Sequence, residues 1–222
     1  MTMSSKKSLG MADQISKLFA GNAGQLDKVS QANEALMLAY DATLEVWARA
    51  LERRKHEAEG HIRRIAEMTV EVARLLHMTD EQIIQVRRGA LLHDIGEMYV
   101  PDTLLLKQEP LQDDERAVLR KHPEYAYQML FSIEYLRPAL DIPYYHHERW
   151  DGQGYPKGLK GEDIPLAARI FTVVDTWDAL RANRPYRKTW TDEETWDYID
   201  RQTGLEFDPA VVKVFTATYK KP

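Results

Sequence analysis

The sequence predicts an all-α fold, and two observations carry the prediction. Apolar residues recur at helical spacings of three and four along most of the chain, and no stretch alternates apolar and polar residues as a half-buried strand would. The chain has 222 residues, of which 44% are hydrophobic. A chain of this length buries a sizeable core without disulfides or other staples, as one large domain or as a domain with an appendage.

The composition excludes several classes of function. Lysine and arginine total 30 against 35 acidic residues, a net charge of −5, whereas nucleic-acid coats and binders of anionic membranes need a basic surplus. No window approaches the ~18 apolar residues of a spanning helix, and no secretory signal opens the chain. Cysteine is absent, so that any metal must be held by nitrogen and oxygen. We therefore expect a cytoplasmic protein that binds neither nucleic-acid polymers nor membranes.

The N-terminal part divides into two predicted segments. Residues 1–12 are small and polar and predict a flexible tail, while residues 13–54 predict a helical region interrupted near Gly21–Gly24. Within it, an apolar stripe at i, i+4, i+8 and i+11 is formed by Leu36, Tyr40, Leu44 and Trp47. Two interpretations stay open: the stripe packs on the core, or it forms a signalling helix or the seam of a homodimer.

Residues 55–217 predict one helical domain, followed by a tail at 218–222. Thr79 with Gln82 three residues later predicts a capping box that opens a helix. This pattern and the apolar stripes around it place the core of the domain on helices.

Further helix ends follow from local signals. Gly96 is expected to stop the helix that carries His93, and Asp113 is expected to cap a short helix that ends before Pro123. Residues 151–165 contain four glycines and two prolines and predict a loop. Residues 170–180 predict a helix again.

Glu57 and His61 are the first polar residues on a predicted buried face. They lie four positions apart, and Ile65 and Val72 extend the same helix face inward. Because a buried polar group without a partner costs a few kcal/mol, roughly 2–7, something must satisfy this pair. A salt-bridged surface pair and a pair of metal ligands are both compatible with the spacing.

Histidines and carboxylates recur later in the chain, at helix ends or among apolar residues. Each by itself has an ordinary explanation, such as a capping role or a helix-dipole interaction. As an ordered set on helices, however, they predict a polynuclear metal site inside a helical bundle. Imidazole with carboxylate favours iron, manganese or zinc over magnesium and calcium. The set is Glu57, His61, His93, Asp94, His122, His146, His147 and Asp175.

Three strings resemble the HD-GYP family, a branch of the HD metal-dependent phosphohydrolases: HDIG at 93–96, HHERWDGQGYP at 146–156 and DTWDALRANRPYRK at 175–188. The resemblance covers about residues 40–217. It implies an HD-type helical bundle with an N-terminal helical extension, the phosphohydrolase domain being 55–217. It also implies that a metal-bridging hydroxide opens cyclic di-GMP to pGpG and, in many members, on to GMP.

The resemblance carries roles over position by position. The set of eight residues above would hold two or three divalent ions, iron or manganese before zinc or nickel, with Glu57 and His61 matching members that hold a third ion. His93, Asp94 and Glu97 would be catalytic. The substrate would lie against Gly154, Tyr155 and Pro156, and Arg184 and Arg187 would clamp its phosphates, because a guanidinium donates bidentate hydrogen bonds.

Glu97 departs from the family pattern, which usually has a lysine that contacts the substrate phosphate. Exchanging a cation for an anion there reverses a Coulomb interaction of about 1–4 kcal/mol. Three functions stay open: a cyclic di-GMP phosphodiesterase, a same-fold enzyme for another nucleotide such as cyclic GMP-AMP, and a silent cyclic dinucleotide receptor. Since 13–54 is shorter than the ~100 residues of a typical domain, three expectations stay open: regulation by a partner, such as a sensor or a diguanylate cyclase, a chain that is a fragment, or a minimal stand-alone member.

Overall fold

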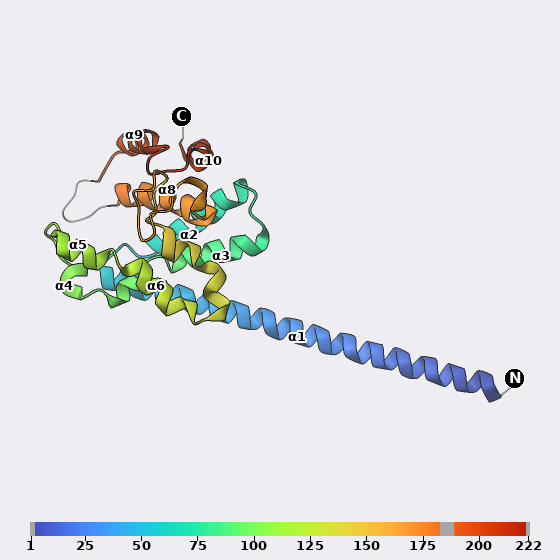
Figure 1. Ribbon diagram of the computed structural model, residues 1–222. Helices are drawn as coiled ribbons and strands as arrows, with labels where there is room; N and C mark the ends of the chain where they lie inside the picture. The colour runs from blue at the N-terminus through green and yellow to red at the C-terminus, as the bar shows by residue number, and fades with distance from the viewer. Residues whose placement is uncertain (1–2, 183–188, 221–222) are drawn as a thin grey trace. The chain divides into compact units, whose positions relative to one another are not determined.

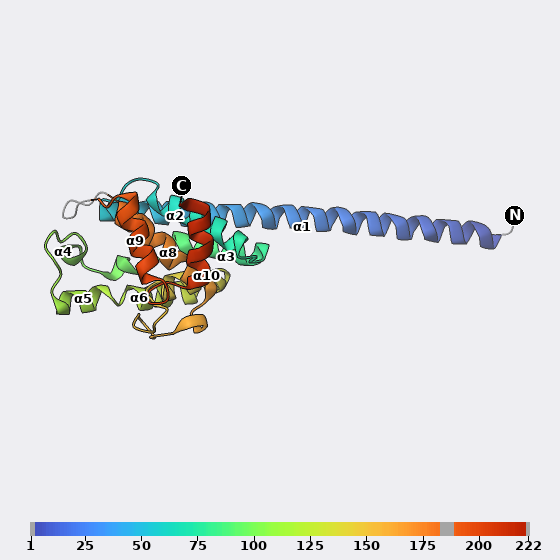
Figure 2. The same cartoon turned by 90° about the horizontal axis from the view of Figure 1, so that it is seen from above.

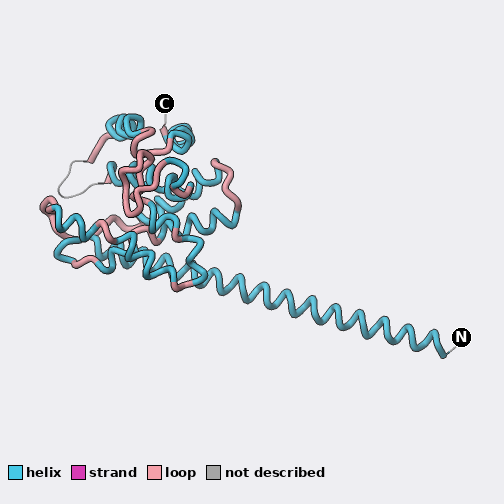
Figure 3. Tube along the Cα trace, viewed as in Figure 1, coloured by secondary structure: helices cyan, strands magenta, loops and turns pink. Residues whose placement is uncertain are grey.

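The computed structural model describes residues 3–182 and 189–220, with the backbone alone for 3–24. These residues form helices and loops and contain no strand, which confirms the all-α prediction (Figures 1 and 3). No helix in this part of the chain is long and apolar enough to cross a membrane.

Helix α1 (Met3–Lys55) is continuous. The tail predicted for residues 1–12 is therefore wrong from Met3 on, and so is the interruption at Gly21–Gly24. An isolated glycine costs a helix only about 1 kcal/mol, and no proline is present to break the hydrogen-bond ladder.

The chain divides into two units, one ending at Thr43 and the other beginning at Leu44. The compact second unit starts earlier than the boundary predicted at residue 55, because Leu44, Ala48 and Leu51 of α1 are buried in its core. Within that unit the helical elements follow in the order α2 (His61–Leu75), α3 (Asp80–Leu91), η1 (Ile95–Tyr99), α4 (Asp102–Leu105), α5 (Asp113–Leu119), α6 (His122–Phe131), η2 (Glu134–Ala139), α7 (Asp141–Tyr145), η3 (Gly161–Asp163), α8 (Leu166–Arg181), α9 (Asp192–Gln202) and α10 (Pro209–Tyr219).

Helix α2 lies at the centre of the packing. It contacts α3, α8 and α10, and α9 and α10 in turn pack on α8 (Figure 2). Its buried face includes Ile65 and Val72, as the apolar stripe predicted, and also Ile62. The core thereby formed supports the ends of α3, α6 and α7, where the polar residues gather.

Several local predictions are confirmed. The Thr79 hydroxyl accepts from the Gln82 backbone N–H at 3.3 Å and the Gln82 side chain accepts from the Thr79 N–H at 2.9 Å, which is the expected capping box. Residues 151–165 form a loop apart from the short turn η3, and the helix expected at 170–180 is α8. Helix α10 continues to Tyr219, past the start of the tail expected at 218–222.

Other helix ends differ from the prediction. Helix α3 ends at Leu91, and Gly96 lies inside η1 rather than stopping a helix. His122 begins α6 instead of ending α5, because Pro123 in the first turn of a helix loses no hydrogen bond. The N-cap of α5 is Gln112, not Asp113.

Gly96 allows η1 to lie directly against α6. A Cβ at this position would be 1.9 Å from the backbone oxygen of His122 and 2.6 Å from the nitrogen of Ala126. Any side chain would push the two backbones apart. Glycine here therefore sets the distance between the turn that carries Asp94 and the helix that carries His122.

We predict that Gly96→Ala lowers the free energy of unfolding by about 3 kcal/mol, because the new methyl overlaps backbone atoms that cannot move aside. Chemical denaturation monitored by circular dichroism measures the change. Gly161→Ala is the matched control: its φ is 59° and its Cβ meets nothing within 4 Å. That variant should lose about 1 kcal/mol from backbone strain alone. Equal losses in the two variants would contradict the close approach.

Candidate metal centre

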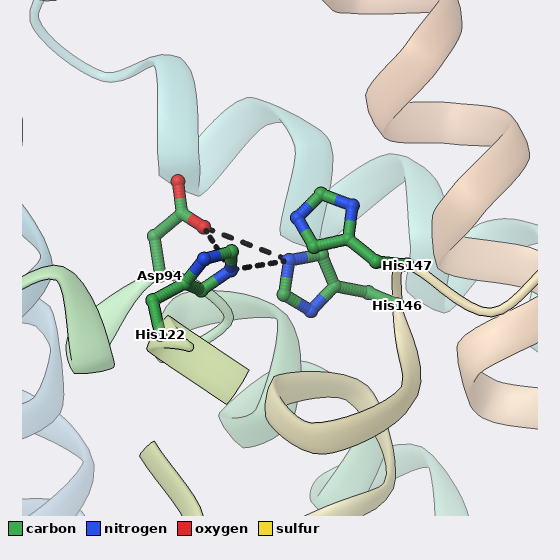
Figure 4. A group of neighbouring side chains, drawn as sticks. All are labelled: Asp94, His122, His146 and His147. Carbon is green, nitrogen blue, oxygen red and sulfur yellow. Dashed lines mark hydrogen bonds and ion pairs between the residues drawn. The ribbon is translucent and has the colours of Figure 1, made fainter. Parts of the chain in front are cut away.

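Four side chains converge at the ends of three helices (Figure 4). One ligand atom from each of Asp94, His122, His146 and His147 lies within 4.8 Å of all the others. Asp94 Oδ1 is 3.4 Å from His122 Nε2 and 3.6 Å from His146 Nε2. Asp94 follows α3, His122 begins α6, and His146 and His147 follow α7. Residues far apart in the sequence therefore share one small volume.

The backbone fixes which nitrogen each imidazole presents. Three Nδ1 atoms lie 2.9 Å from backbone carbonyl oxygens, pairing His93 with Ala90, His122 with Leu119, and His146 with Ile142. A carbonyl only accepts, so each Nδ1 carries the proton, and a neutral ring then presents the lone pair on Nε2. Histidines that bind metals are oriented in this way by a hydrogen bond from their other nitrogen.

The Nε2 atoms of His122 and His146 are 3.3 Å apart. When both rings are neutral with Nδ1 protonated, two lone pairs face each other beside the Asp94 carboxylate. A divalent cation satisfies all three groups at once. Imidazole nitrogen and carboxylate oxygen are ligands that iron, manganese and zinc accept, so the residues fit such an ion.

Electrostatics keeps the groups in their ligating forms. Burial opposes ionisation of Asp94, but the charges of His93 and Lys55 outweigh it and hold the pKa of this carboxyl well below its usual value. Burial lowers the pKa of His122 to about 4, and burial with the neighbouring His146 lowers the pKa of His147 far below its normal value. At neutral pH, therefore, the Asp94 carboxylate is charged and the imidazoles of His122 and His147 are neutral, as metal ligation requires.

His93 is held against Asp94. Its Nε2 lies 3.2 Å from Asp94 Oδ2. Burial alone would lower its pKa, but the Asp94 charge outweighs burial and raises the pKa to about 9. His93 thus joins the cluster as the ion-pair partner of Asp94.

Asp175 lies near the cluster but is not one of its four residues. It projects from α8 and lines a cavity of about 350 Å³ together with His146, His147 and Tyr155. Thr172, one turn earlier on α8, donates a 2.9 Å hydrogen bond to the His146 backbone oxygen and ties the helix to this side of the centre.

Glu57 and His61 lie on another side, where they line a cavity of about 720 Å³. His61 is buried, as the sequence predicted, and its Nδ1 is 2.8 Å from Asp178 Oδ2. Arg64 donates to both oxygens of Asp178, over 2.8–3.0 Å. The two residues are therefore not part of the four-residue cluster, but His61 is oriented by a carboxylate.

Lys55 is the residue that sequence analysis missed. Its Nζ lies 2.6 Å from Asp94 Oδ2, 3.0 Å from Glu97 Oε2 and 3.2 Å from Glu57 Oε1. Burial and the charge of Asp94 raise the pKa of Glu97 to about 7, and Lys55 opposes that rise. The sequence does contain one indication of Lys55. Glu97 stands where the HD-GYP pattern has a lysine, and a buried carboxylate there needs a cation from another part of the chain.

The predicted substrate wall lies over the histidines. The Tyr155 ring stacks on His147 with ring centres 4.7 Å apart, and the Arg120 guanidinium lies 5.2 Å from the Tyr155 ring centre. Gly154 has no room for a side chain, since a Cβ would be 2.4 Å from the Arg149 nitrogen. Pro156 follows Tyr155 through a cis peptide bond.

Glu148, the third residue of the HHE string, holds this loop. It is buried, and Oε1 accepts from the N–H groups of Lys157 and Gly158 at 2.7 and 3.1 Å, while Oε2 accepts from that of Leu159 at 3.0 Å. The carboxylate thus has a structural role. Arg184 and Arg187, the predicted phosphate clamp, lie outside the described residues.

Comparison with known proteins places this geometry in a family. A family model described as HD domain matches residues 45–211. The chain is 39% identical over 172 residues to the cyclic di-GMP phosphodiesterase response regulator RpfG of Xanthomonas campestris, covering 77% of this chain and 46% of that protein. It is 36% identical over 169 residues to the 3'3'-cGAMP-specific phosphodiesterase 2 of Vibrio cholerae, covering 75% and 32%.

A solved structure of Bd1817, an HDG"Y"P protein from Bdellovibrio bacteriovorus, shares the fold, with a TM-score of 0.58 at 22% identity over 72% of this chain and 52% of that one. The chain belongs to the HD domain family, and the HD-GYP resemblance of its motifs is confirmed. It spans less than half the length of the two curated relatives.

Proposed function

We propose that this chain is a metal-dependent phosphodiesterase that hydrolyses cyclic dinucleotides, with cyclic di-GMP as the preferred substrate. The observation that carries the proposal is the convergence of Asp94 with the Nε2 atoms of His122 and His146. Membership of the HD domain family supports it, as does the similarity to a protein named as a cyclic di-GMP phosphodiesterase.

Asp94, His122, His146 and His147 would hold the metal, with His93 and Asp175 beside them; Glu57 and His61 are the remaining predicted ligands. The ions would be divalent, iron or manganese before zinc or nickel. When bound, such ions supply an activated water and neutralise charge on phosphoryl oxygens.

The chain's own residues would bind and orient the substrate. The cavity of about 720 Å³ beside Glu57, His61 and Glu97 has the size of a small-molecule site. Tyr155, stacked on His147, offers an aromatic face, and Arg120 places a positive charge above it. Glu97 borders both the cavity and Asp94, where its carboxyl could give a proton to the leaving 3′ oxygen.

A second candidate is the same reaction on cyclic GMP-AMP. It is favoured by the similarity to a protein named as a 3'3'-cGAMP-specific phosphodiesterase. Chromatographic assay of cyclic di-GMP, cyclic GMP-AMP and linear pGpG with manganese-loaded protein separates the two. Binding of all three without turnover would identify a receptor instead.

We predict that Asp94→Asn and His147→Gln each lower cyclic di-GMP hydrolysis at least about 100-fold, with loss of bound metal, because each removes a ligand. Product chromatography and elemental analysis measure the two effects. Asp197→Asn, at an exposed position on α9, is the control and should keep both properties. Near-normal turnover with full metal content in either ligand variant would refute the proposed centre.

We further propose that α1 pairs with α1 of a second copy in parallel. Positions 26, 29, 33, 36, 40 and 43 alternate by three and four, the heptad spacing of a coiled coil. Leu26, Val29 and Leu36 on this seam are 70%, 54% and 46% exposed. Asn33 occupies a core position, where asparagine favours a two-stranded register.

Leu36→Lys is expected to convert the dimer to a monomer, because it places a charge in each helix at the seam. Analytical ultracentrifugation of the full chain measures the mass. Leu38→Lys is the matched control, since Leu38 is 72% exposed and two positions off the seam, and it should remain dimeric. A monomeric parent protein, or equal behaviour of the two variants, would contradict the pairing.

A further inference from the structure

Lys55 makes ion pairs with three carboxylates, and the reaction outlined above gives this lysine no role. The ammonium carries three N–H donors, and three acceptors surround it: Asp94 at 2.6 Å, Glu97 at 3.0 Å and Glu57 at 3.2 Å. The Lys55 side chain is 15% exposed, and those of Glu57, Asp94 and Glu97 are 19%, 12% and 9% exposed. Carboxylates packed together in this way require a cation.

The position of Lys55 is built by its neighbour on α1. Arg54 donates to the backbone oxygens of Glu97 at 2.7 Å and Val100 at 2.6 Å, and to Asp102 Oδ1 at 2.9 Å. The end of α1 is thereby attached by one hydrogen bond each to η1, to Val100 just after it and to the first residue of α4. Lys55, the next residue and the last of the helix, is thus directed at Asp94 by fixed backbone rather than by chance.

The surrounding groups are those that would hold another metal ion. Glu57 supplies a carboxylate, and Asp94 adds the oxygen that faces away from His122 and His146. His61 has its Nδ1 engaged by Asp178, which leaves Nε2 as the lone-pair nitrogen. Arg64 already neutralises Asp178, so that carboxylate does not attract Lys55.

We infer that the Lys55 ammonium takes the place of a third metal ion, so that the chain binds two ions and keeps Glu57 and His61 free of metal. This inference rests on the metal centre proposed above. Glu97, whose Oε2 lies 3.0 Å from Lys55 Nζ, is one of the three carboxylates that anchor the ammonium. The number of metal ions bound is then limited by the Lys55 side chain and not by a lack of ligating groups.

The test counts metal ions in the full chain. Protein freed of metal is titrated with Mn²⁺ by calorimetry, and its content after dialysis is measured by elemental analysis. We expect two manganese ions per chain in the parent protein. Lys55→Met should bind three, because the uncharged side chain leaves three carboxylates and His61 without a cation.

Two further variants make the outcome specific. Lys55→Met combined with Glu57→Gln should return to two ions, since the third ion loses its carboxylate. Lys220→Met removes a lysine paired with Asp200 at 3.1 Å on another face and should keep two ions. Lys55→Gln serves in the same way if the methionine variant does not fold.

Three ions in the parent protein, or two ions in the single variant Lys55→Met (or in Lys55→Gln where it replaces Lys55→Met), would overturn the inference. The count is independent of catalysis and so separates the two proposals. A change from two ions to three in a protein without phosphodiesterase activity would support the role of Lys55 while refuting the proposed function.

Discussion

The arrangement of this domain depends on one electrostatic constraint: a buried carboxylate, Asp94, lies among imidazole nitrogens whose lone pairs face it and one another. Backbone carbonyls hold the proton on Nδ1 of His122 and His146, so that each neutral ring presents its Nε2 lone pair toward Asp94. Leaving such groups unpaired inside a protein is costly. The core of α2, α3 and α8 supplies the stability needed to hold them together, and a bound cation resolves the conflict.

Several features that look unrelated serve this constraint. Gly96 removes a side chain so that the turn carrying Asp94 can touch the backbone at His122. Glu148 collects three backbone N–H groups and so folds the loop that lays Tyr155 on His147. Arg54 and Lys55 attach the end of α1 to the opposite side of Asp94. The His122 and His146 imidazoles therefore lie at Oδ1 of Asp94, whereas the Lys55 ammonium and the His93 imidazole lie at Oδ2.

Much of this could be predicted from the sequence, because the information was local. Helical periodicity predicted the all-α class, and the Thr79–Gln82 spacing predicted a cap that the structure confirms. The histidines that meet at Asp94 were predicted from their residue types and their order along the chain. His122 was expected at a helix end but begins a helix, since Pro123 fits a first turn as well as it ends a preceding one.

The sequence-based predictions that were wrong or missing depended on contacts between residues distant in the sequence, or on small differences in helix free energy. The glycines near position 21 predict a break in α1, but their cost of about 1 kcal/mol each does not end a long helix. The sequence alone does not single out Lys55, because a basic residue at a helix C-terminus is common. Its role follows from its ion pairs with Asp94 and Glu97, some forty positions further on. Glu148 was noted as part of a motif, but its role as the acceptor for the loop becomes visible only when the loop is folded.

The most direct measurement is anomalous diffraction from crystals of the manganese-loaded protein at the metal absorption edge. We expect a peak about 2.0–2.3 Å from a carboxylate oxygen of Asp94 and from the Nε2 atoms of His122 and His146. A crystal soaked in excess manganese that shows no peak at Asp94, or with these imidazoles turned away from it, would contradict the metal centre.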